Sequence, residues 1–119
     1  MIDKILDLKD DMPLDVYNDI LNEAIKSGDA RALFMLAYFI KNANVLKLGE
    51  EILKTNNHRY ISFFMRSIPN IDKEKFLKKI LELGSERDAY YCLFDNRDLE
   101  DEQVFKLMEK CRTSQKYYY

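Results

Sequence analysis

The side chains that most often form nucleophilic or metal sites are few in this sequence. There is one histidine, His58, and there are two cysteines, Cys92 and Cys111. A Cys–His nucleophilic pair needs both side chains within hydrogen-bond reach, and nothing in their spacing predicts such a pair. One histidine and two separated cysteines do not supply the four ligands of a typical zinc site either. We therefore expect a protein that is not an enzyme and that uses no cofactor and no metal.

Arginine is the residue type whose spacing suggests binding. Arg31, Arg59 and Arg87 lie 28 residues apart, and they would form a row if the fold repeated with that period. Each falls at the expected start of a helix, where a cation is mildly unfavourable for the helix dipole. A row of guanidinium groups suits a carboxylate, a phosphate or an acidic protein surface. The alternative is a solvated face on which these arginines pair with Asp29, Glu86 or Asp88.

An aromatic residue and a fourth arginine complete the candidate partner-binding set. Tyr38 and Arg66 also lie 28 residues apart, so in a repeat they would share one position and face outward together. Tyrosine is a common anchor of protein interfaces because it packs and hydrogen-bonds at low entropic cost. We therefore take Arg31, Arg59, Arg87, Tyr38 and Arg66 as the candidate binding residues.

The elements that would position these residues follow from an internal repeat. Apolar residues recur every 28 positions in several columns. The clearest columns are Ile20, Leu48, Phe76 and Val104; Ala24, Ile52, Ile80 and Met108; Ile5, Leu33, Ile61 and Ala89; and Leu8, Leu36, Phe64 and Cys92. Their spacing within a unit is that of amphipathic helices. Each unit therefore predicts a helical hairpin.

Turn and capping residues recur in the same register. Gly28, Asn56 and Gly84 follow the second helix of each unit, where the chain must turn through a left-handed conformation. The next residues, Asp29, Asn57 and Ser85, are good N-caps for the following helix. The sequence predicts one all-α domain over residues 1–119, a short α-solenoid of about four 28-residue hairpins, and the alternative is a compact helical bundle in which the repeat is degenerate. The predicted units are 1–28, 29–56, 57–84 and 85–112, with a tail at 113–119.

The middle units resemble a helical-hairpin repeat found in uncharacterised proteins of Gram-positive bacteria and their phages. The resemblance rests on the stretch Asn57–Arg66 and on Ala43–Thr55, and the outer units depart from it. Its architecture is similar to that of HEAT-like and tetratricopeptide-like solenoids. It implies a scaffold that binds another macromolecule, and it carries no catalytic residue.

Charge is distributed unevenly along the predicted units. The net charges are −4, +1, +3 and −3 in order, so the ends are acidic and the middle is basic. We expect a protein–protein interaction module, such as a small inhibitor or adaptor that occupies a partner surface. The alternative is nucleic-acid binding by the basic middle units, which would need the arginine row and Lys73, Lys75, Lys78 and Lys79 on one continuous face. Self-association by stacking of end faces is a further reading.

The sequence shows no apolar run long enough to span a membrane and no signal-peptide segment at its start. We expect a cytoplasmic protein with no membrane contact.

Overall fold

The structure is a computed structural model that describes residues 2–83, 85–95 and 99–112. These residues contain eight helices and no strand, so the all-α prediction is confirmed. The helices are α1 (Ile2–Leu8), α2 (Leu14–Ser27), α3 (Ala30–Phe39), α4 (Val45–Lys54), α5 (His58–Ser67), α6 (Lys73–Leu83), α7 (Glu86–Asp95) and α8 (Asp101–Arg112).

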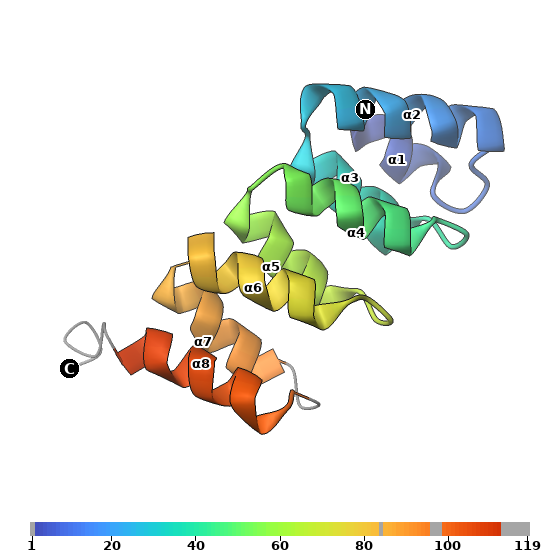
Figure 1. The fold of residues 1–119 in the computed structure, drawn as a ribbon. Helices are drawn as coiled ribbons and strands as arrows, with labels where there is room; N and C mark the ends of the chain where they lie inside the picture. The colour runs from blue at the N-terminus through green and yellow to red at the C-terminus, as the bar shows by residue number, and fades with distance from the viewer. Residues whose placement is uncertain (1, 84, 96–98, 113–119) are drawn as a thin grey trace.

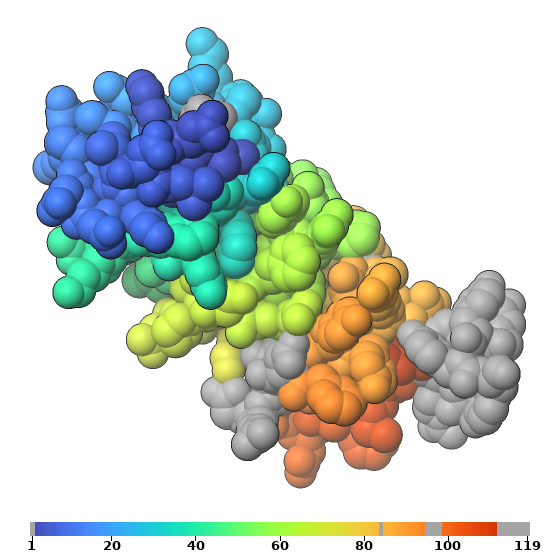
Figure 2. Space-filling view, turned by 180° about the vertical axis from the view of Figure 1, so that it is seen from behind, coloured from blue at the N-terminus to red at the C-terminus, as the bar shows by residue number. Residues whose placement is uncertain are grey.

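The helices succeed one another along an elongated body (Figures 1 and 2), which measures 48 × 25 × 22 Å. The odd-numbered helices contact one another in series, α1 with α3, α3 with α5 and α5 with α7. Each even-numbered helix from α4 onward packs against the odd-numbered helix before it, and α4 and α6 also contact the odd-numbered helix that follows. The odd-numbered helices therefore form a continuous layer on which side chains from separate hairpins become neighbours.

Helix starts follow the period of the sequence. The starts of α1, α3, α5 and α7 lie 28 residues apart, as do those of α4, α6 and α8. Helix α2 is the exception, because it begins at Leu14, directly after Pro13. Proline fixes its own φ and disfavours helical conformation in the residue before it, so the helix cannot extend backward through this point.

The predicted caps are present where the chain is described. Asp29 Oδ1 accepts a hydrogen bond from the backbone N–H of Ala32 at 3.0 Å, and Asn57 Oδ1 accepts one from that of Tyr60 at 3.3 Å. Ser85 Oγ accepts one from the backbone N–H of Asp88 at 3.2 Å. The turns before the first two of these caps are left-handed, with φ of 65° at Gly28 and 55° at Asn56. Gly84, the third predicted turn residue, lies outside the described residues.

The predicted columns form the core, with one correction. Their members in the inner units are fully buried, among them Leu33, Leu36, Leu48, Ile52, Ile61, Phe64 and Ile80. Met108 was predicted to belong to this core, but it is 49% exposed, and Leu107 is buried in α8 instead. Helices α4 and α6 contact helices that follow them in the chain, whereas no described helix follows α8. Phe105, which shares a column with buried Leu77, is likewise exposed, at 74%.

No helix within the described parts of the chain combines the length and apolar character that a membrane span requires.

Candidate functional site

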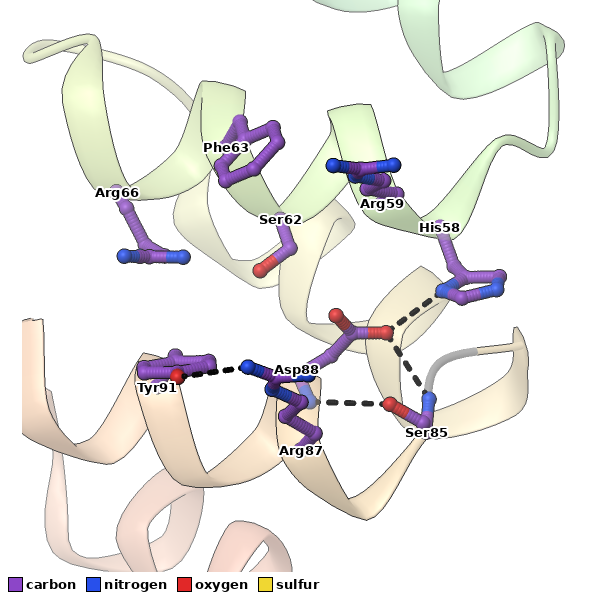
Figure 3. Close-up of a pocket in the computed structure, with 9 residues that line it drawn as sticks. All are labelled: His58, Arg59, Ser62, Phe63, Arg66, Ser85, Arg87, Asp88 and Tyr91. Carbon is purple, nitrogen blue, oxygen red and sulfur yellow. Dashed lines mark hydrogen bonds and ion pairs between the residues drawn. The ribbon is translucent and has the colours of Figure 1, made fainter.

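A pocket of about 580 Å³ opens between α5 and α7, where two odd-numbered helices from consecutive hairpins meet. Figure 3 shows side chains from both helices pointing into the space between them. The lining residues are His58, Arg59, Ser62, Phe63 and Arg66 on α5, Arg87, Asp88 and Tyr91 on α7, and Ser85 just before α7.

Arginines and aromatic rings alternate along this pocket. The guanidinium carbon of Arg59 lies 5.8 Å from the ring centroid of Phe63, and that of Arg66 lies 5.5 Å from the same centroid. Arg66 also lies over the ring of Tyr91 at 4.7 Å, and Arg87 approaches that ring at 5.6 Å. These five side chains form what we call the arginine–aromatic row. Cation–π contacts of this kind hold guanidinium groups in place.

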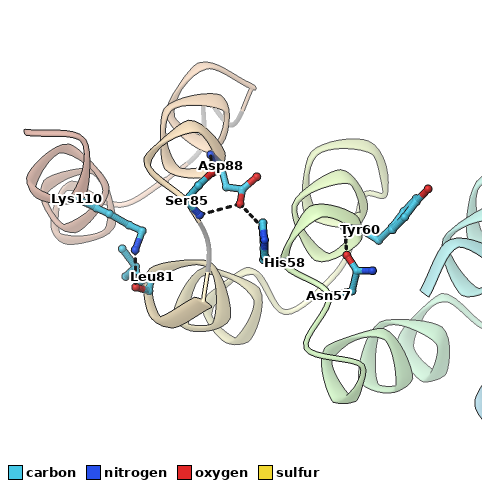
Figure 4. A network of polar contacts seen from close by, with 7 residues as sticks. All are labelled: Asn57, His58, Tyr60, Leu81, Ser85, Asp88 and Lys110. Carbon is cyan, nitrogen blue, oxygen red and sulfur yellow. Dashed lines mark hydrogen bonds and ion pairs between the residues drawn. The ribbon is translucent and has the colours of Figure 1, made fainter. Parts of the chain in front are cut away.

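The carboxylate of Asp88 has a structural role in the pocket. Its Oδ2 atom accepts a hydrogen bond from the backbone N–H of Ser85 at 3.0 Å and lies 2.7 Å from Nδ1 of His58 (Figure 4). Together with the Ser85 hydroxyl bonded to the N–H of Asp88, this is a reciprocal capping box at the start of α7. His58 thus joins the N-terminus of α5 to the N-terminus of α7, across the boundary between two hairpins.

The hydroxyl of Ser62 is the unusual polar group of the site. Ser62 is 2% exposed, and its Oγ atom has no hydrogen-bond partner among the described residues. In Figure 3 this oxygen points from α5 toward α7, into the pocket. A buried hydroxyl without a partner costs free energy, so most such groups in folded proteins are satisfied.

The structure brings together three of the five predicted binding residues. Arg59, Arg66 and Arg87 line the pocket. Arg31 lies exposed in the first turn of α3, outside the pocket lining. Tyr38 is 56% exposed and packs on Phe34 and Phe39 beside a separate hollow near the start of α4.

Sequence reasoning did not select Ser62, Asp88 or Tyr91 for this site. Ser62 carries a detectable signal, because it is the polar member of a column whose other members are Leu6, Phe34 and Tyr90. Asp88 carries a local signal, the Ser-x-x-Asp spacing of a capping box that begins at Ser85, and Tyr91 shares a column with Phe63. That both face one pocket depends on how closely α7 approaches α5.

The cysteines and the histidine are not assembled into one centre. The Sγ of buried Cys92 lies 3.9 Å from the Sδ of Met65, while the Sγ of Cys111 lies 3.8 Å from the carbonyl oxygen of Glu86. Burial raises the pKa of the Cys111 thiol, and the carboxylate of Glu86 raises it further. The described residues contain no group of three or more histidine, cysteine or acidic side chains placed to hold a metal ion.

No protein-family model, no curated protein and no solved structure matches this chain.

Proposed function

We propose that the chain is a non-enzymatic protein–protein interaction module, a short α-solenoid of stacked helical hairpins that acts as an inhibitor or adaptor by occupying a partner surface. The partner binds along the layer of odd-numbered helices, over the arginine–aromatic row. The observation that carries the proposal is this row, because it brings three guanidinium groups and two rings from two hairpins to one pocket.

The composition of the row supports a protein partner. Arginine and tyrosine are enriched among the residues that contribute most to binding at protein interfaces. The rings of Tyr60 and Phe34 extend the aromatic surface toward α3. The ring centroid of Phe34 lies 6.3 Å from that of Tyr60 and 6.1 Å from that of Phe63. A partner segment lying across α3, α5 and α7 would therefore contact aromatic rings on α3 and the guanidinium groups on α5 and α7.

Nucleic-acid binding is the alternative, and the position of the lysines weighs against it. Lys75 and Lys78 line hollows beside α6, and glutamates such as Glu74, Glu82 and Glu102 line the same hollows. No lysine of α6 lines the pocket that holds the arginines. A backbone-tracking site for nucleic acid needs a continuous positive groove.

The test is capture from a lysate of the source cell with three baits. The first is the intact chain, the second carries Arg59→Ala, Arg66→Ala and Arg87→Ala, and the third is a control with Lys26→Ala, Lys47→Ala and Lys78→Ala. The two triple variants lose the same charge, but the three lysines lie exposed on even-numbered helices. We expect a protein that the intact chain and the lysine variant capture and the arginine variant does not.

Replacement of Phe63 by a photo-crosslinking phenylalanine analogue checks the site of contact. The captured protein should crosslink at position 63 and not at position 46, because Leu46 is exposed on α4 beside a different hollow. Capture by the arginine variant at the same level would overturn the proposal. Recovery that nuclease treatment abolishes would establish the nucleic-acid alternative.

A further inference from the structure

We infer that the pocket between α5 and α7 binds a doubly charged phosphate monoester carried on a side chain of the partner protein. The guanidinium groups of Arg59, Arg66 and Arg87 and the hydroxyl of Ser62 are its donors. This inference rests on the proposed function, since it names the chemical group that the interaction module recognises.

The first observation is the hydroxyl of Ser62. It is almost completely buried, it points into the pocket, and it has no partner among the described residues. An apolar residue at this position of the repeat would avoid the cost of a buried unsatisfied group, and Leu6, Phe34 and Tyr90 stand at the equivalent positions. A ligand oxygen that accepts from this hydroxyl would recover that free energy on binding.

The second observation is the charge of the lining. Three guanidinium groups and one carboxylate, that of Asp88, are among the described lining residues. Asp88 is turned toward the backbone N–H of Ser85 and toward His58, and both contact its Oδ2 atom at the edge of the pocket. Three guanidinium groups in one lining suit an anion that carries close to two negative charges, as a phosphate monoester does near neutral pH.

The number and direction of donors favour phosphate over carboxylate. A carboxylate presents two oxygens in one plane and is satisfied by a single bidentate arginine. A phosphate monoester presents three terminal oxygens, so it can accept from arginines on both helices and from Ser62 at once. Arg66 and Ser62 reach down from α5 while Arg87 comes from α7 (Figure 3), so donors surround the pocket from two sides.

The aromatic rings prepare the arginines for this role. Arg66 lies between the rings of Phe63 and Tyr91, and Nη2 of Arg87 donates to the hydroxyl of Tyr91 at 3.4 Å. Side chains that are ordered before binding lose less conformational entropy when the ligand arrives. The rings also give an apolar wall to the carbon atoms that carry the phosphate group.

The inference is tested with small probes and the ¹⁵N-labelled full chain. The probes are phenyl phosphate, phenyl sulfate of the same shape with one charge, and benzoate, and the readout is the NMR signals of the backbone and arginine Nε–H groups. Phenyl phosphate should give saturable shifts in α5 and α7. Phenyl sulfate and benzoate should bind about tenfold or more weakly, because phenyl sulfate carries one negative charge fewer and benzoate also presents one acceptor oxygen fewer.

Two variants assign the donors. Ser62→Ala and Arg66→Gln should each weaken phenyl phosphate binding about tenfold, the size of one hydrogen bond to a charged group. Lys47→Gln removes a charge on α4 and should leave the affinity unchanged. The signal dispersion in the same spectra reports whether each variant is folded. Absence of shifts with millimolar phenyl phosphate, or an equal affinity in all four proteins, would overturn the inference.

The source of the phosphate is tested separately. A partner captured from the lysate should be lost when the lysate is treated with a protein phosphatase, and adenosine monophosphate should not compete for the pocket better than phenyl phosphate. If the arginine variant loses the partner but the phosphatase has no effect, the phosphate inference fails and the proposed function stands. If phenyl phosphate binds but the arginine variant keeps its partner, the pocket is a phosphate site, and the proposal that the partner binds over the arginine–aromatic row is wrong.

Discussion

The guanidinium group of Arg66 on α5 lies 4.7 Å from the ring centroid of Tyr91 on α7. This contact crosses the boundary between two hairpins, and it makes the geometry of the pocket depend on both. Because the ring belongs to α7, the packing of α7 against α5 determines the orientation of the Arg66 guanidinium group.

Removal of the Tyr91 ring should therefore impair the pocket more than removal of its hydroxyl. We expect Tyr91→Leu to weaken phenyl phosphate binding about fivefold, in line with the loss of cation–π contacts worth about 1 kcal/mol. Tyr91→Phe keeps the ring and should change the affinity by less than about twofold. Titration by NMR measures both. Equal losses in the two variants would mean that the hydroxyl, and not the ring, orders the arginines.

Ser62→Ala should make the protein more stable. The substitution removes a buried hydroxyl that has no partner among the described residues, and it introduces a better helix former. We expect a gain of about 1 kcal/mol in the free energy of unfolding, measured by urea denaturation. The control is Ser67→Ala, because Ser67 is exposed at the last position of the same helix. A loss of stability in Ser62→Ala would show that the hydroxyl is satisfied in the folded protein.

Ile80→Ala and Met108→Ala form a matched pair from the same repeat column. Ile80 is fully buried, and its truncation should cost about 2–5 kcal/mol of the free energy of unfolding, as should that of Ile52. Met108 is 49% exposed, and its truncation should cost less than about 1 kcal/mol. Chemical denaturation of the three variants tests the assignment. A small cost at both Ile52 and Ile80 would refute the repeat register.

Gly49 lies within α4, where alanine would ordinarily be favoured by about 1 kcal/mol. A Cβ atom at this position would lie 3.3 Å from Cζ of Phe76 and 3.5 Å from Cε1 of Phe64, whose rings stack at 5.3 Å. We expect Gly49→Ala to leave the stability nearly unchanged, because the tight contact offsets the helix propensity. Gly49→Leu should destabilise by about 2 kcal/mol or more through overpacking. Thermal unfolding of both variants measures the effect, and a tolerated leucine would mean that the ring stack can shift.

The two cysteines should differ in alkylation. Cys92 is fully buried and should react only when the fold opens. Cys111 is partly exposed, but burial and then the Glu86 carboxylate raise the pKa of its thiol. A raised pKa leaves less thiolate at neutral pH, so Cys111 should react with iodoacetamide more slowly than an unstructured cysteine, and faster as the pH rises. Mass spectrometry of timed samples follows both sites. Glu86→Gln should lower the pKa and speed the reaction of Cys111, and an unchanged rate would argue against this cause.

The buried helix faces and the turns between units could be predicted from the sequence, because both depend on local residue patterns. The columns identified the buried faces, and Gly28, Asn56, Asp29 and Asn57 marked where one hairpin ends and the next begins. These features depend on neighbours within a few residues or on a fixed period. Met108 was misassigned because the period treats every unit as an inner one, whereas no helix after α8 is described that could cover this residue.

The candidate site was predicted only in part for a related reason. Arg59 and Arg87 were found because they share a column, but the contact of Arg66 with Tyr91 depends on how α5 packs against α7. The His58–Asp88 pair joins residues 30 positions apart, which differs from the period by two. A search at the period alone cannot detect such a pair, since it requires the crossing geometry of two helices.

The position of the pocket at a boundary also has an evolutionary consequence. Neither hairpin contains the pocket alone, because Ser62 and Arg66 come from one and Arg87 and Tyr91 from the next. Duplication of a single 28-residue unit would create a second boundary of the same kind without a change of register. Duplication or loss of one unit would therefore add or remove such a pocket in a single step.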